Sequence, residues 1–97
     1  MRLDADAIQR IRGAVDAHFG QGSRIWLFGS MLDDQARGGD VDLYVEPTDP
    51  LPANLFLARQ ALKRELEQTL RRPVDVLVRR APPTAFMRQA RAEGQRL

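Results

Sequence analysis

The sequence predicts an α/β fold, a two-layer sandwich in which helices cover one face of a small mixed sheet. Two long stretches repeat apolar residues every three or four positions, which is the pattern of amphipathic helices. Three short apolar runs lie between and after them, and two of these runs alternate aliphatic residues with aspartate, as half-buried strands do. The order helix, strand, turn, strand, helix, strand, helix is typical of two layers around a single core.

The first helix is predicted over residues 4 to 19. Asp4 is suited to cap its start and Gly20 to end it. Its expected buried side chains are Ile8, Ile11, Val15 and Phe19. After a polar turn, residues 25 to 28 (Ile-Trp-Leu-Phe) are short, apolar and of strand-forming types, so they predict a buried strand that ends at Gly29.

The second predicted strand alternates aliphatic and polar residues from Val41 to Val45. The aliphatic residues share one face, whereas Asp40, Asp42 and Tyr44 share the other. The acids are therefore expected on an open face that is backed by an apolar one. Core packing is the expected role of Tyr44, and contact with a base or ribose on the acids' face is the alternative.

The second half of the chain predicts a helix, a strand and a short final helix. A proline-rich connection leads into a helix over residues 53 to 71, and its apolar positions are Leu55, Ala58, Leu62, Leu66 and Leu70. In the strand over residues 74 to 78, the valines are expected to point inward and Asp75 outward. A helix over residues 83 to 93 is expected to turn Phe86 and Ala90 toward the core.

Length and composition limit what the chain can be. Ninety-seven residues suffice for one small domain, residues 1–97, with a modest core. We expect a cytoplasmic location, because no apolar run is long enough for a membrane span, no secretory signal is visible and cysteine is absent. The lack of cysteine also excludes disulfides, thiolate metal sites and a thiol nucleophile.

Arginine supplies fourteen of the fifteen basic residues, and the formal net charge is +2. Guanidinium groups suit bidentate contacts with phosphate or carboxylate, so contacts with nucleotides are permitted and direct nucleic-acid binding stays open. The pairs Arg71-Arg72 and Arg79-Arg80 flank the third predicted strand. Solvation or compensation of helix ends is their expected role, and binding of triphosphate, nucleic acid or an acidic partner is the alternative.

Three carboxylates, those of Asp40, Asp42 and Asp75, are expected to share one face of the sheet. Like charges close together repel and raise each other's pKa, and a divalent cation removes that cost. Mg²⁺ prefers oxygen ligands and often joins one or two carboxylates to the phosphates of a nucleotide. We therefore expect a two-metal site in which Asp40 and Asp42 bridge two Mg²⁺ ions and Asp75 completes the ligands of the ion that binds an attacking hydroxyl.

Gly29 and Ser30 supply a phosphate-binding turn directly after the first strand. A glycine there lets backbone N–H groups approach a phosphate closely, and Ser30 adds a hydroxyl. A short helix that begins near Met31 would favour an anion further through its dipole.

The pair Gly29-Ser30, followed by Asp40-Val41-Asp42 and a later strand aspartate, Asp75, resembles the nucleotidyltransferases of the DNA polymerase beta superfamily. Within it, the length and element order resemble the minimal nucleotidyltransferases that pair with helical HEPN-type proteins in toxin–antitoxin systems. The resemblance implies transfer of a nucleoside monophosphate, expected to be AMP from ATP, to a hydroxyl. It also implies two Mg²⁺ ions held by the three acids, and triphosphate bound by Gly29 and Ser30.

The turn departs from the family pattern after Ser30. Met31, Leu32, Asp33 and Asp34 follow, where many members have basic residues and a glycine. Arg37 is the nearest basic residue, and we expect it either to replace the missing one at the nucleotide or to pair with the two acids. Extra acids close to a triphosphate weaken anion binding unless they point away or help to bind metal.

Two classes of function follow. The first is an Mg²⁺-dependent nucleotidyltransferase that modifies a hydroxyl of a partner protein, with a HEPN-type toxin as the partner that the resemblance implies. The second is a non-catalytic antitoxin or interaction module that neutralises its partner by binding alone. Transfer to a small antibiotic or to RNA is disfavoured, because such enzymes supplement this core with further domains. A homo-oligomer or hetero-oligomer is compatible with either class.

Overall fold

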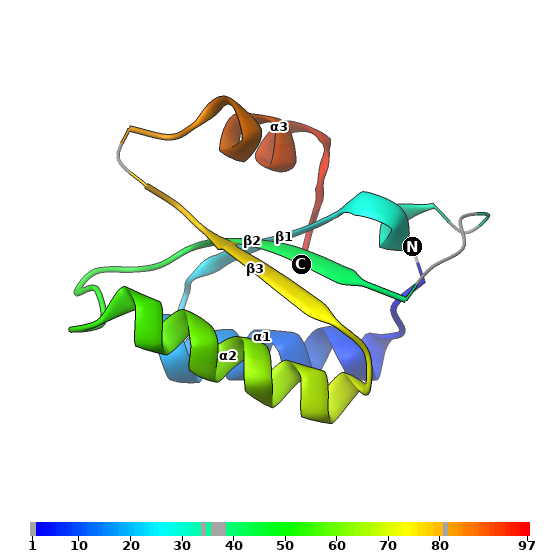
Figure 1. Ribbon diagram of the computed structural model, residues 1–97, viewed down its shortest axis with the longest axis horizontal. Coiled ribbons are helices and arrows are strands. Elements are labelled where there is room, and N and C mark those ends of the chain that lie inside the picture. The colour runs from blue at the N-terminus through cyan, green and yellow to red at the C-terminus, as the bar shows by residue number, and fades with distance from the viewer. Residues whose placement is uncertain (1, 34, 36–38, 81) are drawn as a thin grey trace.

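The computed structural model describes residues 2–33, 35, 39–80 and 82–97. Within them, three α-helices and a short 3-10 helix accompany a four-stranded mixed sheet. Helices α1 and α2 lie together on one face of the sheet, and α3 lies on the other (Figure 1). The predicted mixed α and β architecture is confirmed, but the prediction that the helices cover only one face of the sheet is wrong for the last helix.

The sheet has the strand order β3-β2-β1-β4. Its strands are β1 (Arg24–Phe28), β2 (Val41–Glu46), β3 (Val74–Val78) and β4 (Gln95–Arg96). β1 pairs antiparallel with β2 and with β4, whereas β2 and β3 are parallel. A parallel pair needs a long crossover connection, and α2 supplies it between β2 and β3. The sequence predicts the first three strands to within one residue, but it does not predict β4, which has only two residues.

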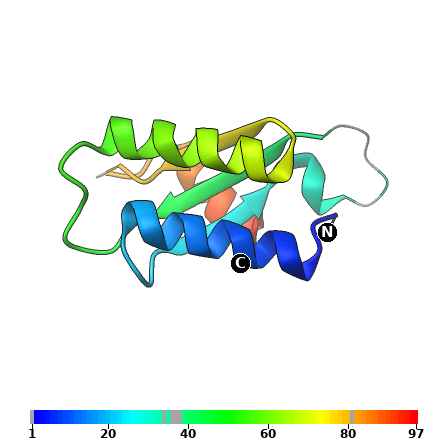
Figure 2. The same ribbon diagram turned by 90° about the horizontal axis from the view of Figure 1, so that it is seen from below.

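Two long helices form the layer beneath the sheet (Figure 2). α1 (Ala5–Phe19) begins as predicted, with the Asp4 carboxylate accepting a hydrogen bond from the Ala7 amide at 2.8 Å. α2 (Leu55–Leu70) is capped by Asn54, whose side chain accepts from the Leu57 amide at 3.1 Å. No helix in the described part of the chain has both the length and the apolar character that a membrane crossing requires.

The main core lies between these helices and the sheet. Alternate residues of β1, β2 and β3 turn toward α1 and α2, as the strand patterns predict. The members of this core that are at most 3% exposed include Ile11, Val15, Phe19, Leu27, Val41, Leu43, Val45, Leu62, Leu66, Val74 and Val76. Met31, from the turn after β1, is also fully buried in it. The remaining residues of these strands point to the opposite face of the sheet, toward α3.

α3 (Ala85–Glu93) packs on the opposite face, over a second small core. Met87 and Ala90 point into it against Trp26 and Tyr44, so the predictions of core packing for Tyr44 and of a buried strand that includes Trp26 are confirmed. The prediction that Phe86 faces the core is wrong, because its side chain is 56% exposed. Met87 takes that place, since the helix turns the next residue toward the aromatic pair.

Candidate functional site

Two of the predicted acids lie side by side on neighbouring strands. Asp42 of β2 is the register partner of Asp75 of β3 and, on its other side, of Phe28 at the end of β1. Asp40 stands just before β2 and is exposed. The neighbouring strand valines are buried against the helix layer, so Asp42 and Asp75 point to the face that α3 shares. The alternation seen in the sequence predicts this common face.

The charges of Asp75 and Asp40 act on the Asp42 carboxylate. Asp42 is half-buried, and its pKa is raised, first by partial burial, then by the charge of Asp75 and then by that of Asp40. All three causes penalise the ionised form. The Asp42 carboxylate is therefore a position where a bound cation would relieve an existing electrostatic cost.

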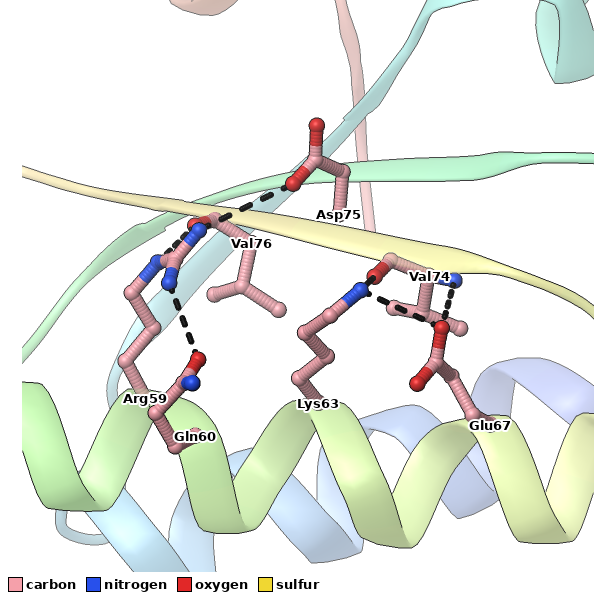
Figure 3. A network of polar contacts seen from close by, with 7 residues as sticks. All are labelled: Arg59, Gln60, Lys63, Glu67, Val74, Asp75 and Val76. Carbon is pink, nitrogen blue, oxygen red and sulfur yellow. Dashed lines mark hydrogen bonds and ion pairs between the residues drawn. The ribbon is translucent and has the colours of Figure 1, made fainter.

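Asp75 has a basic neighbour that the sequence does not reveal. Its side chain is 74% exposed, and the Arg59 guanidinium lies 3.7 Å from its carboxylate. Arg59 comes from α2, beneath the sheet, and reaches Asp75 around the outer edge of β3 (Figure 3). The Arg59 Nε also donates to the Val76 carbonyl at 2.6 Å, which fixes the guanidinium at this edge. No local sequence signal pairs these residues, because only the crossover brings α2 alongside β3.

Further side chains of α2 hold the same edge (Figure 3). Lys63 Nζ donates to the Val74 carbonyl at 2.6 Å, and the Val74 amide donates to the Glu67 carboxylate at 3.1 Å. The pKa of Glu67 is lowered, first by this amide and then by Lys63. An open sheet edge presents unpaired backbone groups, so these contacts satisfy β3 and hold the strand that carries Asp75 in position.

Gly29 lies directly against the Asp42 carboxylate. Its φ is +78°, a conformation that side chains rarely adopt, and a Cβ at this position would collide with Asp42 Oδ2. Gly29 also begins the 3-10 helix η1 (Gly29–Leu32), two residues earlier than the predicted start at Met31. The glycine therefore permits both the turn and the close approach of its backbone to the acid.

The residues after Gly29 explain much of the departure from the family pattern. Ser30 is half-buried, and its carbonyl accepts from the Arg2 side chain at 3.2 Å and from the Asp33 amide at 3.1 Å. Met31 points into the core, so it is a packing residue. Asp33 is exposed and accepts from the Gln35 amide at 2.9 Å, which is a local turn contact.

Asp34 and Arg37 lie outside the described residues, so the expected role of Arg37 at the nucleotide stays a prediction.

Tyr44 shares the acids' side of the sheet but is buried, and its hydroxyl donates to Glu46 at 3.0 Å. Core packing therefore describes Tyr44 better than contact with a base or ribose.

The acids fit a magnesium site in the kind of donor that they offer. Carboxylate oxygens from two neighbouring strands, with mutual repulsion at Asp42, are the donors that Mg²⁺ prefers. Within the described ranges, however, no three carboxylates or histidines gather closely enough to hold an ion. The Arg59 guanidinium lies 3.7 Å from the Asp75 carboxylate, so Arg59 would compete with a cation for this acid.

Pockets lie on both sides of the acids. One, of about 220 Å³, is lined by Asp40 and Asp75 together with Lys63 at the β3 edge. The other, of about 380 Å³, begins at Gly29 and Phe28 and runs under α3. Asp42 lies between them, since it is the register partner of both Phe28 and Asp75. The two pockets therefore lie on either side of β2, one at the β3 edge and the other beside the end of β1.

Comparison with known families agrees with this geometry. A family model described as Polymerase beta, Nucleotidyltransferase matches residues 20–97. The match includes all four strands, α2 and α3, the Gly29 turn and the three acids. Neither the curated proteins nor the solved structures yield a match. Because the matched region covers most of the chain, the protein belongs to the polymerase beta-type nucleotidyltransferase family.

Proposed function

We propose that this protein is an Mg²⁺-dependent nucleotidyltransferase that transfers a nucleoside monophosphate, AMP from ATP, to a hydroxyl of a partner protein. The observation that carries the proposal is the placement of Asp42 beside Asp75 with the Gly29 backbone against its carboxylate. An acid pair beside a glycine turn that can accept phosphate is the arrangement that phosphoryl transfer needs. Family membership supports the reaction class.

Each residue has a distinct role in this proposal. Asp40 and Asp42 would hold both metal ions, and Asp75 would complete the ligands of the ion nearest the acceptor. When bound, the ions neutralise phosphate charge and lower the pKa of the attacking hydroxyl. The backbone of Gly29 and the Ser30 hydroxyl bind the triphosphate. The acceptor oxygen bonds to the α-phosphorus, the bond to the β-phosphate oxygen breaks, and pyrophosphate and the acceptor's proton leave.

An exposed apolar patch supports a protein as the acceptor. Leu51, Phe56 and Leu57 lie at the start of α2 and before it, and Phe56 is 64% exposed. A groove of about 410 Å³ beside them is also lined by Arg59, Arg79 and Arg80. Exposed apolar groups with a charged rim are typical of protein interfaces. The family resemblance points to a HEPN-type toxin as the partner, with this single domain as its cytoplasmic antitoxin.

The test is transfer of labelled AMP from ATP to the partner in the presence of Mg²⁺. Asp42→Asn should reduce transfer by at least about a hundredfold, because it removes a metal-binding charge between the phosphates and the acceptor. Asp6→Asn is the matched control, since Asp6 is exposed on α1 and paired with Arg10. Absence of label with the wild type, or full label with Asp42→Asn, would sink the proposal.

A non-catalytic antitoxin is the second candidate, and one observation favours it. Asp75 faces Arg59, and within the described residues the acids do not converge on one point. In that case binding alone would neutralise the partner through the apolar patch. If cells are rescued from the toxin equally by the wild type and by Asp40→Asn/Asp42→Asn, and rescue is lost in Phe56→Ser, this candidate replaces the first.

A further inference from the structure

The pocket under α3 has walls suited to a flat aromatic group. Phe28 and Phe86 line it, and their rings meet edge to face with centroids 5.7 Å apart. Phe86 is 56% exposed although it is a large apolar side chain, so burial in the core does not account for its position. Nucleobases stack well on exposed aromatic rings. At about 380 Å³, the pocket is also within the usual size range for small-ligand sites.

The polar lining of this pocket favours a neutral group that carries hydrogen-bond donors. Gln89 and Glu93 of α3 are its polar side chains, and Gln89 Nε2 donates to the Glu93 carboxylate at 3.2 Å. Glu93 would repel a phosphate, and no arginine or lysine lines the pocket among the described residues. A carboxylate and an amide oxygen can instead accept hydrogen bonds from an exocyclic amine.

The pocket lies next to the proposed phosphate-binding turn at Gly29. Gly29 contacts the Asp42 carboxylate on one side and lines the pocket on the other. A nucleotide with phosphates at Gly29 and the acids could therefore place its base under α3. On the opposite side, the pocket that Asp40 and Asp75 line at the β3 edge stays open for an acceptor. The two ends of the reaction would then lie on opposite sides of Asp42.

We infer that the pocket formed by Phe28, Phe86, Gln89 and Glu93 binds the base of the nucleoside triphosphate, and that it selects a base with an exocyclic amine. This inference rests on the proposed nucleotidyltransferase function and assigns its base-binding site. Phe86 supplies the stacking surface. Gln89 and Glu93 accept from the amine of adenine, whereas uracil presents a carbonyl at the corresponding position and would face the Glu93 charge.

The experiment compares two ligands by titration calorimetry in the presence of Mg²⁺: ATP, and inorganic tripolyphosphate, which has no base. Phe86→Ala should weaken ATP binding by about tenfold or more and leave tripolyphosphate binding unchanged, because only the stacking contact is lost. Gln68→Ala is the control, since Gln68 is exposed on α2 and lies outside the pocket. It should change neither affinity.

A second comparison tests base selection. Gln89→Ala should reduce the preference for ATP over UTP by about tenfold, as expected for loss of one specific base contact. Gln68→Ala, an exposed glutamine of α2, should leave the preference unchanged. Circular dichroism of each variant reports whether α3 is retained.

The outcomes separate the inference from the function on which it rests. If Phe86→Ala binds ATP as well as the wild type, or loses ATP and tripolyphosphate equally, the base pocket is refuted while the proposed function survives. If wild-type protein binds tripolyphosphate and ATP with equal affinity, the base makes no contact and the inference fails in the same way. If the wild type binds neither ligand, both the proposed function and the inference of a base pocket are refuted.

Discussion

The two faces of the sheet are formed by the same strands but have opposite properties. Toward α1 and α2, alternate strand residues such as Leu27, Leu43 and Val76 are at most 2% exposed and form the main core. Toward α3, the row Phe28, Asp42 and Asp75 is half-buried to exposed and carries the candidate site. Because side chains alternate along a strand, one stretch of chain can secure the fold on one face and expose carboxylates on the other.

The α3 face is also held together differently. Glu46 is buried at 5% exposure, accepts from the Tyr44 hydroxyl and lies 3.3 Å from Arg91 of α3. The Arg91 guanidinium also lies over the Trp26 ring, 5.1 Å from its centroid. The helix that covers this face therefore depends on charged and aromatic contacts as well as on a small apolar core. We expect substitutions on the two faces to change the free energy of unfolding by different amounts, and in some cases in opposite directions.

The largest effect is expected from truncation on the face that α1 and α2 cover. Leu43→Ala removes a fully buried side chain and should lower the free energy of unfolding by about 2–5 kcal/mol. Leu77→Ala, at a half-buried position on the α3 face, should have an effect of about 1 kcal/mol. Denaturant unfolding measures both. Equal losses of stability in the two variants would show that both faces of the sheet contribute equally to the stability of the fold.

Gly29→Ala should be the next largest change. An alanine there must adopt a φ of +78° and meets the Asp42 carboxylate, so we expect a loss of about 1–3 kcal/mol. Gly13→Ala is the control with the opposite sign. Gly13 lies within α1 with open space around it, and a helical alanine there should gain about 0.5–1 kcal/mol. Adding Asp42→Ala to Gly29→Ala should recover part of the loss, and no recovery would argue against the contact.

Glu46→Gln tests the polar attachment of α3. We expect a loss of about 1–2 kcal/mol, because the buried carboxylate is the partner of Arg91 and Tyr44. The pKa of Tyr44 is raised to about 12 by burial and then by its hydrogen bond and charge interaction with Glu46. The substitution should therefore lower this pKa, which ultraviolet titration of the single tyrosine reports. An unchanged titration would show that burial alone sets it.

The smallest change in the free energy of unfolding is expected from Asp42→Asn, which should stabilise the protein rather than destabilise it. A raised carboxyl pKa means that the folded state favours the protonated form, so wild-type stability falls as pH rises through the titration range and stays lower at neutral pH. Removing the charge should stabilise the ligand-free protein at neutral pH, by less than about 1 kcal/mol because solvent screens a half-exposed group.

Two further measurements control this prediction. Below the titration range, the stabilities of the wild type and Asp42→Asn should converge, because both side chains are then uncharged. Mg²⁺ with ATP should raise the melting temperature of the wild type and leave that of Asp42→Asn nearly unchanged. A variant that is less stable than the wild type at neutral pH, or one that responds fully to Mg²⁺ and ATP, would contradict the electrostatic account.

Local periodicity in the sequence is sufficient to predict the helices, the first three strands and the common face of Asp42 and Asp75. These features follow from repeats of two and 3.6 residues, which depend only on neighbours along the chain. The glycine turn and the acids likewise suffice to indicate the family, which the family match to residues 20–97 confirms.

Contacts between residues far apart in sequence determine how the side chains of the site are arranged. The register that aligns Phe28, Asp42 and Asp75, the reach of Arg59 around the sheet edge and the contact between Gly29 and Asp42 all join residues that are distant in sequence. The same is true of α3, whose packing over Trp26 and Tyr44 turns Met87 inward and leaves Phe86 largely exposed, contrary to the prediction. Such choices depend on the packing of whole elements, and no local pattern contains that information.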